Sequence, residues 1–188
     1  GGLHHAHRDR ASGFCLYNDL AVATERAVRR YGLRVAYLDL DAHHGDGVQW
    51  LFYDRPEVMT LSLHESGRYL FPGTGHTFET GQGAGRGLSV NAPLEPFTED
   101  ESYLETFERV VPSALRAFRP DLIVLQAGAD MHANDPLADL KLSAAGIARS
   151  YARVSELADE LCEGRLVATG GGGYDPFDAV PRVWAQLW

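Results

Sequence analysis

Long apolar runs separated by helical patterns restrict the fold of this chain more than any other feature. The runs cover residues 35–41, 58–64, 122–129 and 166–170. The first, third and fourth are nearly continuous rather than alternating, which is typical of strands buried on both faces of a parallel sheet. We therefore predict four strands in an α/β fold, with helices covering both faces of the sheet.

Four helices are predicted between and after these strands, over residues 19–31, 99–118, 143–162 and 178–188. Thr98 begins a capping box for the second helix, and Pro112 is expected to kink it. Ser143 is expected to cap the third helix, which should end before Gly164. Because no repeat, low-complexity tract or linker interrupts the pattern, we expect residues 1–188 to form one domain.

Three of the predicted strands end in segments that are rich in acidic, histidine or glycine residues. The segments are "DLDAH" (39–43), "GAD" (128–130) and "GGGGY" (170–174). In open α/β sheets, ligands bind beyond the carboxyl ends of the strands. If the strands are parallel, all three ends converge on one edge of the sheet, and the sequence predicts a site there.

The first of these segments has the residue types of a metal site. Alternate residues of an extended segment point the same way, so Asp39, Asp41 and His43 are expected to share one face. Aspartate and histidine suit zinc or another first-row divalent ion. Asp41, His43 and Asp130 would supply three ligands and leave a position open for water, the pattern of a catalytic zinc site. The alternative is that these carboxylates cap helices and bind backbone amides.

Two adjacent histidines, His4 and His5, lie near the start of the chain. A zinc hydrolase needs a base to deprotonate water, and an imidazole suits that role. Asp39 and Asp46 could each orient one of the two rings, as carboxylates beside metal sites do. A purely structural role for the histidine pair is the alternative.

Loops carry the remaining candidate side chains. Four glycines before Tyr174 allow the backbone to pass close to a ligand and turn the tyrosine inward, where its hydroxyl could donate to an oxyanion. A flexible loop with an exposed tyrosine is the other interpretation. Phe14, Phe71 and Leu137 are either core residues or the walls of an apolar channel, and their spacing does not decide between these roles.

Composition narrows the class of partner. The formal net charge of −9 argues against direct binding to nucleic acid or to an anionic membrane. Two cysteines, Cys15 and Cys162, do not make a disulfide framework, so a reducing compartment, the cytoplasm, is the simpler expectation. No apolar run approaches the about 18 residues of a membrane span. The oligomeric state has no signal in the sequence.

Six segments resemble, in order, those of the zinc-dependent histone deacetylase superfamily. They are "GGLHHA" (1–6), "SGFCLYND" (12–19), "YLDLDAHHGDG" (37–47), "FPGTG" (71–75), "LQAGAD" (125–130) and "GGGGY" (170–174). Residues 128–140 and 162–188 look most like the bacterial acetoin utilization deacetylases. The resemblance implies an arginase/deacetylase fold, with three α/β/α layers and a mainly parallel sheet.

The resemblance also implies a reaction, the hydrolysis of an N-acetyl amide by a zinc enzyme, with Fe²⁺ as the alternative metal in vivo. The substrate would be acetyl-lysine in a protein or a small acetylated amine. By motif match, Asp41, His43 and Asp130 align with the zinc ligands. The catalytic residues would be His4, His5, Asp39, Asp46 and Tyr174, with His5 as the general base. The substrate-binding residues would be Gly13, Phe14, Phe71 and Leu137. A structural K⁺ site would use Asp39, Asp41, His43, Ser62 and Leu63.

The chain departs from the family pattern at its start. Family members carry a substantial segment before the first motif, including early strands of the sheet, and this sequence lacks it. We expect a fragment of a longer protein, because a sheet without those strands exposes an edge. Two rival functions stand beside the deacetylase, namely an arginase-like ureohydrolase with two manganese ions and a non-catalytic acetyl-lysine binder.

Overall fold

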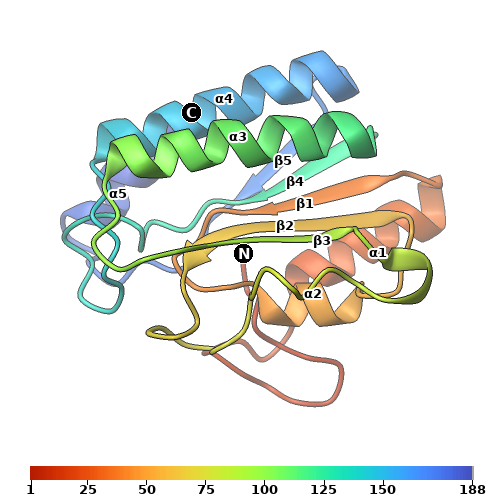
Figure 1. Cartoon of the computed structure of the whole chain (residues 1–188), viewed down its shortest axis with the longest axis horizontal. Coiled ribbons are helices and arrows are strands. Elements are labelled where there is room, and N and C mark those ends of the chain that lie inside the picture. The colour runs from red at the N-terminus through yellow and green to blue at the C-terminus, as the bar shows by residue number, and fades with distance from the viewer. Residues whose placement is uncertain (188) are drawn as a thin grey trace.

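The computed structural model describes residues 1–187, so Trp188, at the end of the last predicted helix, lies outside the described residues. A five-stranded sheet in the order β3-β2-β1-β4-β5 forms the centre of the fold (Figure 1). Its strands are β1 Val35–Asp39, β2 Val58–Glu65, β3 Ser89–Leu94, β4 Leu122–Gln126 and β5 Leu166–Thr169. All four strand pairs are parallel, which confirms the predicted fold class.

Helices lie on both faces of this sheet. The α-helices are α1 Asp19–Tyr31, α2 Asp46–Leu51, α3 Asp100–Phe118, α4 Ala144–Cys162 and α5 Ala179–Trp184. Two 3₁₀ turns, η1 Gly83–Gly85 and η2 Ala185–Leu187, complete the elements. Figure 1 shows α3 and α4 together on one side of the sheet, and α1 and α2 on the other.

The side chains of β1 alternate between two apolar cores. Ala36 and Leu38 join the larger core with residues of α3 and α4. Val35 and Tyr37 join the smaller core with residues of α1 and α2. A strand that is buried on both faces in this way has no polar side, which is why its sequence reads as a continuous apolar run.

Local signals explain several helix ends. The Asn18 side chain accepts a hydrogen bond from the backbone of Ala21 and caps α1, which ends at the left-handed Gly32 (φ 67°). Ser143 caps α4 by accepting from the Gly146 backbone, as predicted. No helix among the described residues is both long and apolar enough to cross a bilayer.

The capping box predicted at the start of α3 is wrong. Glu99 is the N-cap, without a side-chain bond, and the Thr98 hydroxyl donates to the Glu95 carbonyl instead. The Asp100 carboxylate accepts from the backbone and hydroxyl of Ser143, which ties the start of α3 to the start of α4. Pro112 lies inside α3, which continues through it to its end.

Element boundaries differ from the predicted ones, most of all at the strand ends. β1, β4 and β5 end two, three and one residues earlier than predicted (at 39, 126 and 169), because the chain beyond them turns to the site. The predicted last helix is α5 followed by η2 over the described part of the range 178–188. β3 and α2 were not predicted.

The expectation that the run at 166–170 is buried on both faces is wrong. β5 lies at the edge of the sheet, and Val167 is 50% exposed. Among the described residues, only β4 pairs with β5. Within residues 1–187, the apolar residues of this strand therefore do not mark a central position in the sheet.

Candidate active site

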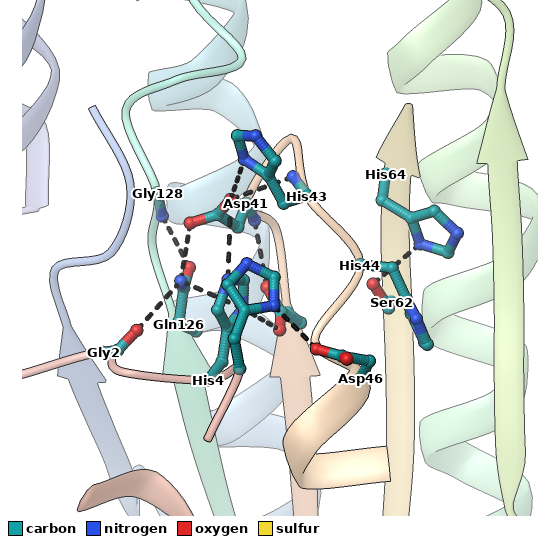
Figure 2. A network of polar contacts seen from close by, with 12 residues as sticks. Gly2, His4, Asp41, His43, His44, Asp46, Ser62, His64, Gln126 and Gly128 are labelled. Atoms are coloured by element: carbon teal, nitrogen blue, oxygen red, sulfur yellow. Dashed lines mark hydrogen bonds and ion pairs between the residues drawn. The ribbon is translucent and has the colours of Figure 1, made fainter. Parts of the chain in front are cut away.

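The polar segments that follow β1 and β4 meet the glycine loop after β5 at one edge of the sheet. Asp41, His43 and Asp130 are all buried, and each offers one ligand atom within 4.8 Å of the others. His43 Nδ1 lies 3.1 Å from Asp41 Oδ1 and 2.9 Å from Asp130 Oδ2. Figure 2 shows Asp41 and His43 beside each other above the end of β1. The structure thus brings together the three residues that the sequence proposed as metal ligands.

Backbone amides and one side-chain amide fix the two carboxylates. The Ala42 amide donates to Asp130 Oδ1 at 2.8 Å. Gly172 N and Gln126 Nε2 each donate to Asp41 Oδ2 at 2.7 Å. A Cβ atom on Gly172 would lie 2.1 Å from Asp130 Oδ2, so only glycine allows this approach of the loop. The glycines after β5 therefore let the backbone reach the carboxylates.

The electrostatics of this cluster suit a cation. Burial and the charge of Asp41 raise the pKa of Asp130 to about 7. Although burial opposes it, the His4 and His43 imidazoles hold the pKa of Asp41 well below its usual value. Two fully buried carboxylates need counter-charge. Two carboxylates and one imidazole are also the donor set of a first-row divalent ion, so the residues present fit such a metal.

The two neighbouring histidines have separate carboxylate partners. His4 Nδ1 is 2.8 Å from Asp39 Oδ2, and His5 Nδ1 is 2.7 Å from Asp46 Oδ1. Burial opposes a charged His4, but Asp39 and Asp41 outweigh it and raise the pKa of His4 to about 9. Burial and the charge of His4 lower the pKa of His5, against the effect of Asp46.

A cavity of about 420 Å³ lies above the cluster. Its lining residues are His5, Gly13, Phe14, His43, Leu70, Phe71, Leu137 and Tyr174. Phe14 is 86% exposed and Phe71 is 49% exposed, so neither is a core residue. The Phe71 ring meets the His5 ring edge-on, with centroids 5.0 Å apart. All four predicted substrate-binding residues line this cavity.

Tyr174 lines the same cavity as His5. Its ring is edge-on to His43, with centroids 6.0 Å apart. Its backbone amide donates to Asp135 Oδ2, while Asp135 Oδ1 accepts from the amide of Leu137, so one carboxylate links the two loops. Burial and the charges of Asp130 and Asp41 raise the pKa of the Tyr174 hydroxyl, which therefore keeps its proton.

The residues predicted for a K⁺ site lie at the ends of β1 and β2. Ser62 is the register partner of Asp39, and Leu63 is fully buried. The Ser62 hydroxyl lies 2.8 Å from His64 Nδ1. These contacts do not test whether a monovalent cation binds, so that site stays a prediction.

Sequence reasoning missed several contributors, namely Tyr37, Leu70, Gln126 and Asp135. Tyr37 donates to the Asp39 carboxylate, and Gln126 donates to that of Asp41. Figure 2 shows Gln126 between Gly2 and Gly128, on the side of Asp41 where His4 also lies. Gln126 had a visible signal, because it is the polar residue in the strand "LIVLQ" (122–126). Asp135 had no such signal in the sequence, because one of its partners, the Tyr174 amide, is brought to it only by the folding of the chain.

Comparisons with known proteins point in one direction. Residues 1–188 match the histone deacetylase domain family. The acetoin utilization protein AcuC of Bacillus subtilis (strain 168) is 52% identical, over 100% of this chain and 49% of the relative. The AcuC protein of Staphylococcus aureus (strain MRSA252) is 46% identical, over 100% and 48%. This chain thus spans about half the length of the curated relatives it matches.

Solved structures agree with these relatives. An HDAC homolog from Aquifex aeolicus superimposes with a TM-score of 0.93 at 39% identity, over 100% of this chain and 49% of that one. The HD domain of HDA15 gives a TM-score of 0.90 at 34% identity, over 100% and 54%.

Proposed function

Because this chain belongs to the histone deacetylase family, we propose that it carries the reaction centre of a metal-dependent deacetylase that hydrolyses N-acetyl amides. One observation carries the proposal. The Asp41–His43–Asp130 cluster lies at an apolar cavity that also receives a neutral imidazole, His5, and a protonated phenol, Tyr174. Metal-assisted amide hydrolysis uses a metal ion, a general base and an oxyanion donor around one carbonyl group, and this site would supply all three.

The metal would be held by Asp41, His43 and Asp130. When bound at this position, a divalent cation would supply Lewis-acid polarisation of the acetyl carbonyl and of water. We propose Zn²⁺, with Fe²⁺ as the alternative in vivo, because carboxylate and imidazole donors suit both. K⁺ bound by Asp39, Asp41, His43, Ser62 and Leu63 is a separate structural proposal.

His5 would act as the general base. Its Nδ1–H donates to Asp46, which leaves the lone pair of Nε2 for the proton of the attacking water. The tautomer is assigned from this partner, because a carboxylate can only accept. A histidine of the pair then returns a proton to the leaving amine. Gly13 packs against His5 so closely that a Cβ there would lie 2.2 Å from the ring, which fixes the ring on one side.

Tyr174 would donate its hydroxyl to the oxyanion of the tetrahedral intermediate, and the cavity walls would hold the substrate. Phe14 and Phe71 offer aromatic surfaces that suit the alkyl stem of lysine, which is apolar up to its amide. The preferred substrate is therefore acetyl-lysine in a protein, with small acetylated amines as the alternative. A role in acetoin utilization and a cytoplasmic location are further proposals, suggested by the names of the AcuC relatives and by the cysteine content.

The rival functions have less support. An arginase-like ureohydrolase would need ligands for two metal ions, and residues 1–187 contain one cluster of suitable ligands. A non-catalytic acetyl-lysine binder would keep the cavity without turnover, and no observation favours it.

The test is acetate release from a panel of acetylated peptides and amines by the full-length, zinc-loaded protein. Asp130→Asn should lose both bound zinc and acetate release, because two remaining ligands make a poor site. Asp159→Asn, at an exposed position on α4, is the matched control and should retain both. Full zinc occupancy of the Asp130 variant in elemental analysis would show that the ligand assignment is wrong. Peptide binding by the wild type without acetate release would favour the binder.

A further inference from the structure

The Asp46 carboxylate has two histidine partners, one on each oxygen. Oδ1 lies 2.7 Å from His5 Nδ1, and Oδ2 lies 3.0 Å from His7 Nε2. The Asp46 side chain is 6% exposed, so water has little access to it. Within residues 1–187 no other hydrogen bond reaches either oxygen. Asp46 therefore holds the proposed base His5 through one oxygen, and His7 holds Asp46 through the other.

The chemistry of the carboxylate assigns the protons. Burial opposes its charge, but the hydrogen bond from His5 and the electrostatic effect of the neighbouring His5 and His7 rings lower the pKa of Asp46. An ionised carboxylate only accepts, so His5 Nδ1 and His7 Nε2 both carry a proton that points at it. Arg10 Nη2 lies 3.2 Å from the same His7 Nε2, but a nitrogen that carries a proton in its ring plane cannot accept from Arg10. The His7–Asp46 bond is thus the interaction that this nitrogen makes.

His7 has no contact with the space where a substrate would bind. It lines a different cavity of about 730 Å³, together with Arg8, Arg10 and Arg55, and is absent from the lining of the cavity that contains Tyr174. Its backbone amide donates to the Arg10 carbonyl, which sets the turn that carries it. A substitution of His7 can therefore affect catalysis only through Asp46 or through the loop.

We propose that His7 is a positioning residue, which fixes Asp46 through Oδ2 so that Asp46 keeps His5 in the orientation and tautomer with a free Nε2. The proposal rests on the deacetylase function proposed above. Without His7, Oδ2 is a buried acceptor without a donor, and the carboxylate is free to turn about its Cβ–Cγ bond. His5 then loses a fixed partner. Removing the hydrogen-bond partner of a metal ligand typically costs about 10- to 100-fold in activity, and His7 lies one contact further out, so we expect a loss of about 10-fold, at the lower end of that range.

The first test compares two variants of the full-length, zinc-loaded protein. His7→Leu keeps the bulk of the side chain but removes the donor, and we expect kcat to fall about 10-fold while KM and zinc content stay near their wild-type values. His7→Gln places an amide N–H near the position of Nε2 and should restore most of the lost kcat. A wild-type kcat in the Leu variant, or an equal loss in the Gln variant, would overturn the proposal.

Arg10→Gln is the matched control for the loop. Arg10 lies beside the same nitrogen but makes no hydrogen bond to Asp46 within the described residues, so its variant should keep kcat close to wild type. A loss as large as that of His7→Leu would show that the loop as a whole, rather than the His7–Asp46 bond, sets the activity.

A second readout does not depend on turnover. The Nδ1 proton of His5 can be followed by NMR of ¹⁵N-histidine-labelled protein, where its exchange with water reports how firmly Asp46 holds it. We expect slow exchange in the wild type and in His7→Gln, and faster exchange in His7→Leu. Equal exchange in all three proteins would refute the role of His7. If the wild type released no acetate but the exchange differed as expected, the proposed function would fail while the positioning role of His7 would stand.

Discussion

His4 and His5 are neighbours in the sequence, yet their surroundings push their pKa values in opposite directions. His4 lies between Asp39 and Asp41, which raise its pKa to about 9, whereas burial lowers the pKa of His5. The ring centroids are only 4.0 Å apart, so the charge of His4 also disfavours a second charge on His5. When the surroundings push the pKa values of two neighbouring groups apart in this way, one group can act as an acid and the other as a base in the same site.

Tyr174 offers the sharpest residue-scale test, because its hydroxyl would act only when an oxyanion forms. Tyr174→Phe removes that donor and keeps the ring against His43 and Phe14. Loss of one oxyanion donor typically reduces kcat by about 10²- to 10³-fold. We expect this reduction in steady-state kinetics, with zinc content and peptide affinity near their wild-type values.

The matched control for Tyr174 is Tyr31→Phe, at an exposed position on α1 that should not affect activity. If the Tyr174→Phe variant kept the wild-type kcat, the Tyr174 hydroxyl would have no role in the reaction.

At the scale of elements, the loop between β2 and η1 positions the Phe71 wall, and a buried polar network fastens it. Glu79 Oε2 accepts from Gln49 Nε2 at 2.7 Å and from the Gly75 amide at 3.0 Å. His44 Nδ1 lies 2.8 Å from the Thr74 hydroxyl. α2 and the residues just before it thus hold the end of the "FPGTG" segment, and through it one side of the cavity.

This network predicts the effect of Glu79→Ala. The variant loses both bonds of the carboxylate, so the loop should become mobile and Phe71 should no longer be held against His5. We expect KM for acetyl-lysine peptides to rise severalfold while kcat and zinc content change little, because the groups at the reacting carbonyl are untouched. Phe71→Ala should raise KM in the same direction. Thr77→Ala, exposed in the same loop, is the control, and an unchanged KM in Glu79→Ala would contradict the link.

Strands and helices could be predicted from the sequence where their apolar residues form a long run or a regular repeat. Elements without such a pattern were missed. β1, β2 and β4 were visible as apolar runs, but β3 contains Asn91 and Pro93 and is only partly buried. α2 has six residues, including Gly47, and is too short to show a helical period.

The same limit applies to the site. Asp41, His43 and Asp130 could be proposed because strand ends of a parallel sheet meet at one edge. Glu79 and Asp135 could not, since their bonds join loops whose paths depend on the whole fold. Functional side chains that directly follow a strand can thus be predicted from the sequence. The residues whose hydrogen bonds hold a loop in place cannot.

At the scale of the whole molecule, the two edges of the sheet differ. β3 carries Pro93, which has no backbone donor, and an edge strand with proline is poorly suited to pairing with another chain. β5 has the sequence "LVAT" with no proline or charge, and among the described residues nothing pairs with its outer side. Beside it lies a small cleft lined by Leu20, Leu122 and Val167.

This asymmetry makes a prediction about association. A protein made of residues 1–188 alone should self-associate through the outer edge of β5, because unpaired backbone groups next to apolar side chains form a template for another strand. Val167→Lys adds a charge to that edge and should shift the protein toward monomer in sedimentation velocity experiments. Val22→Lys is the matched control, since Val22 is 68% exposed but lies on a helix whose backbone bonds are internal. The idea fails if the two variants reduce association equally, or if the parent protein is monomeric. In the full-length protein, a loss of stability caused by Val167→Lys would instead indicate that further chain covers this edge.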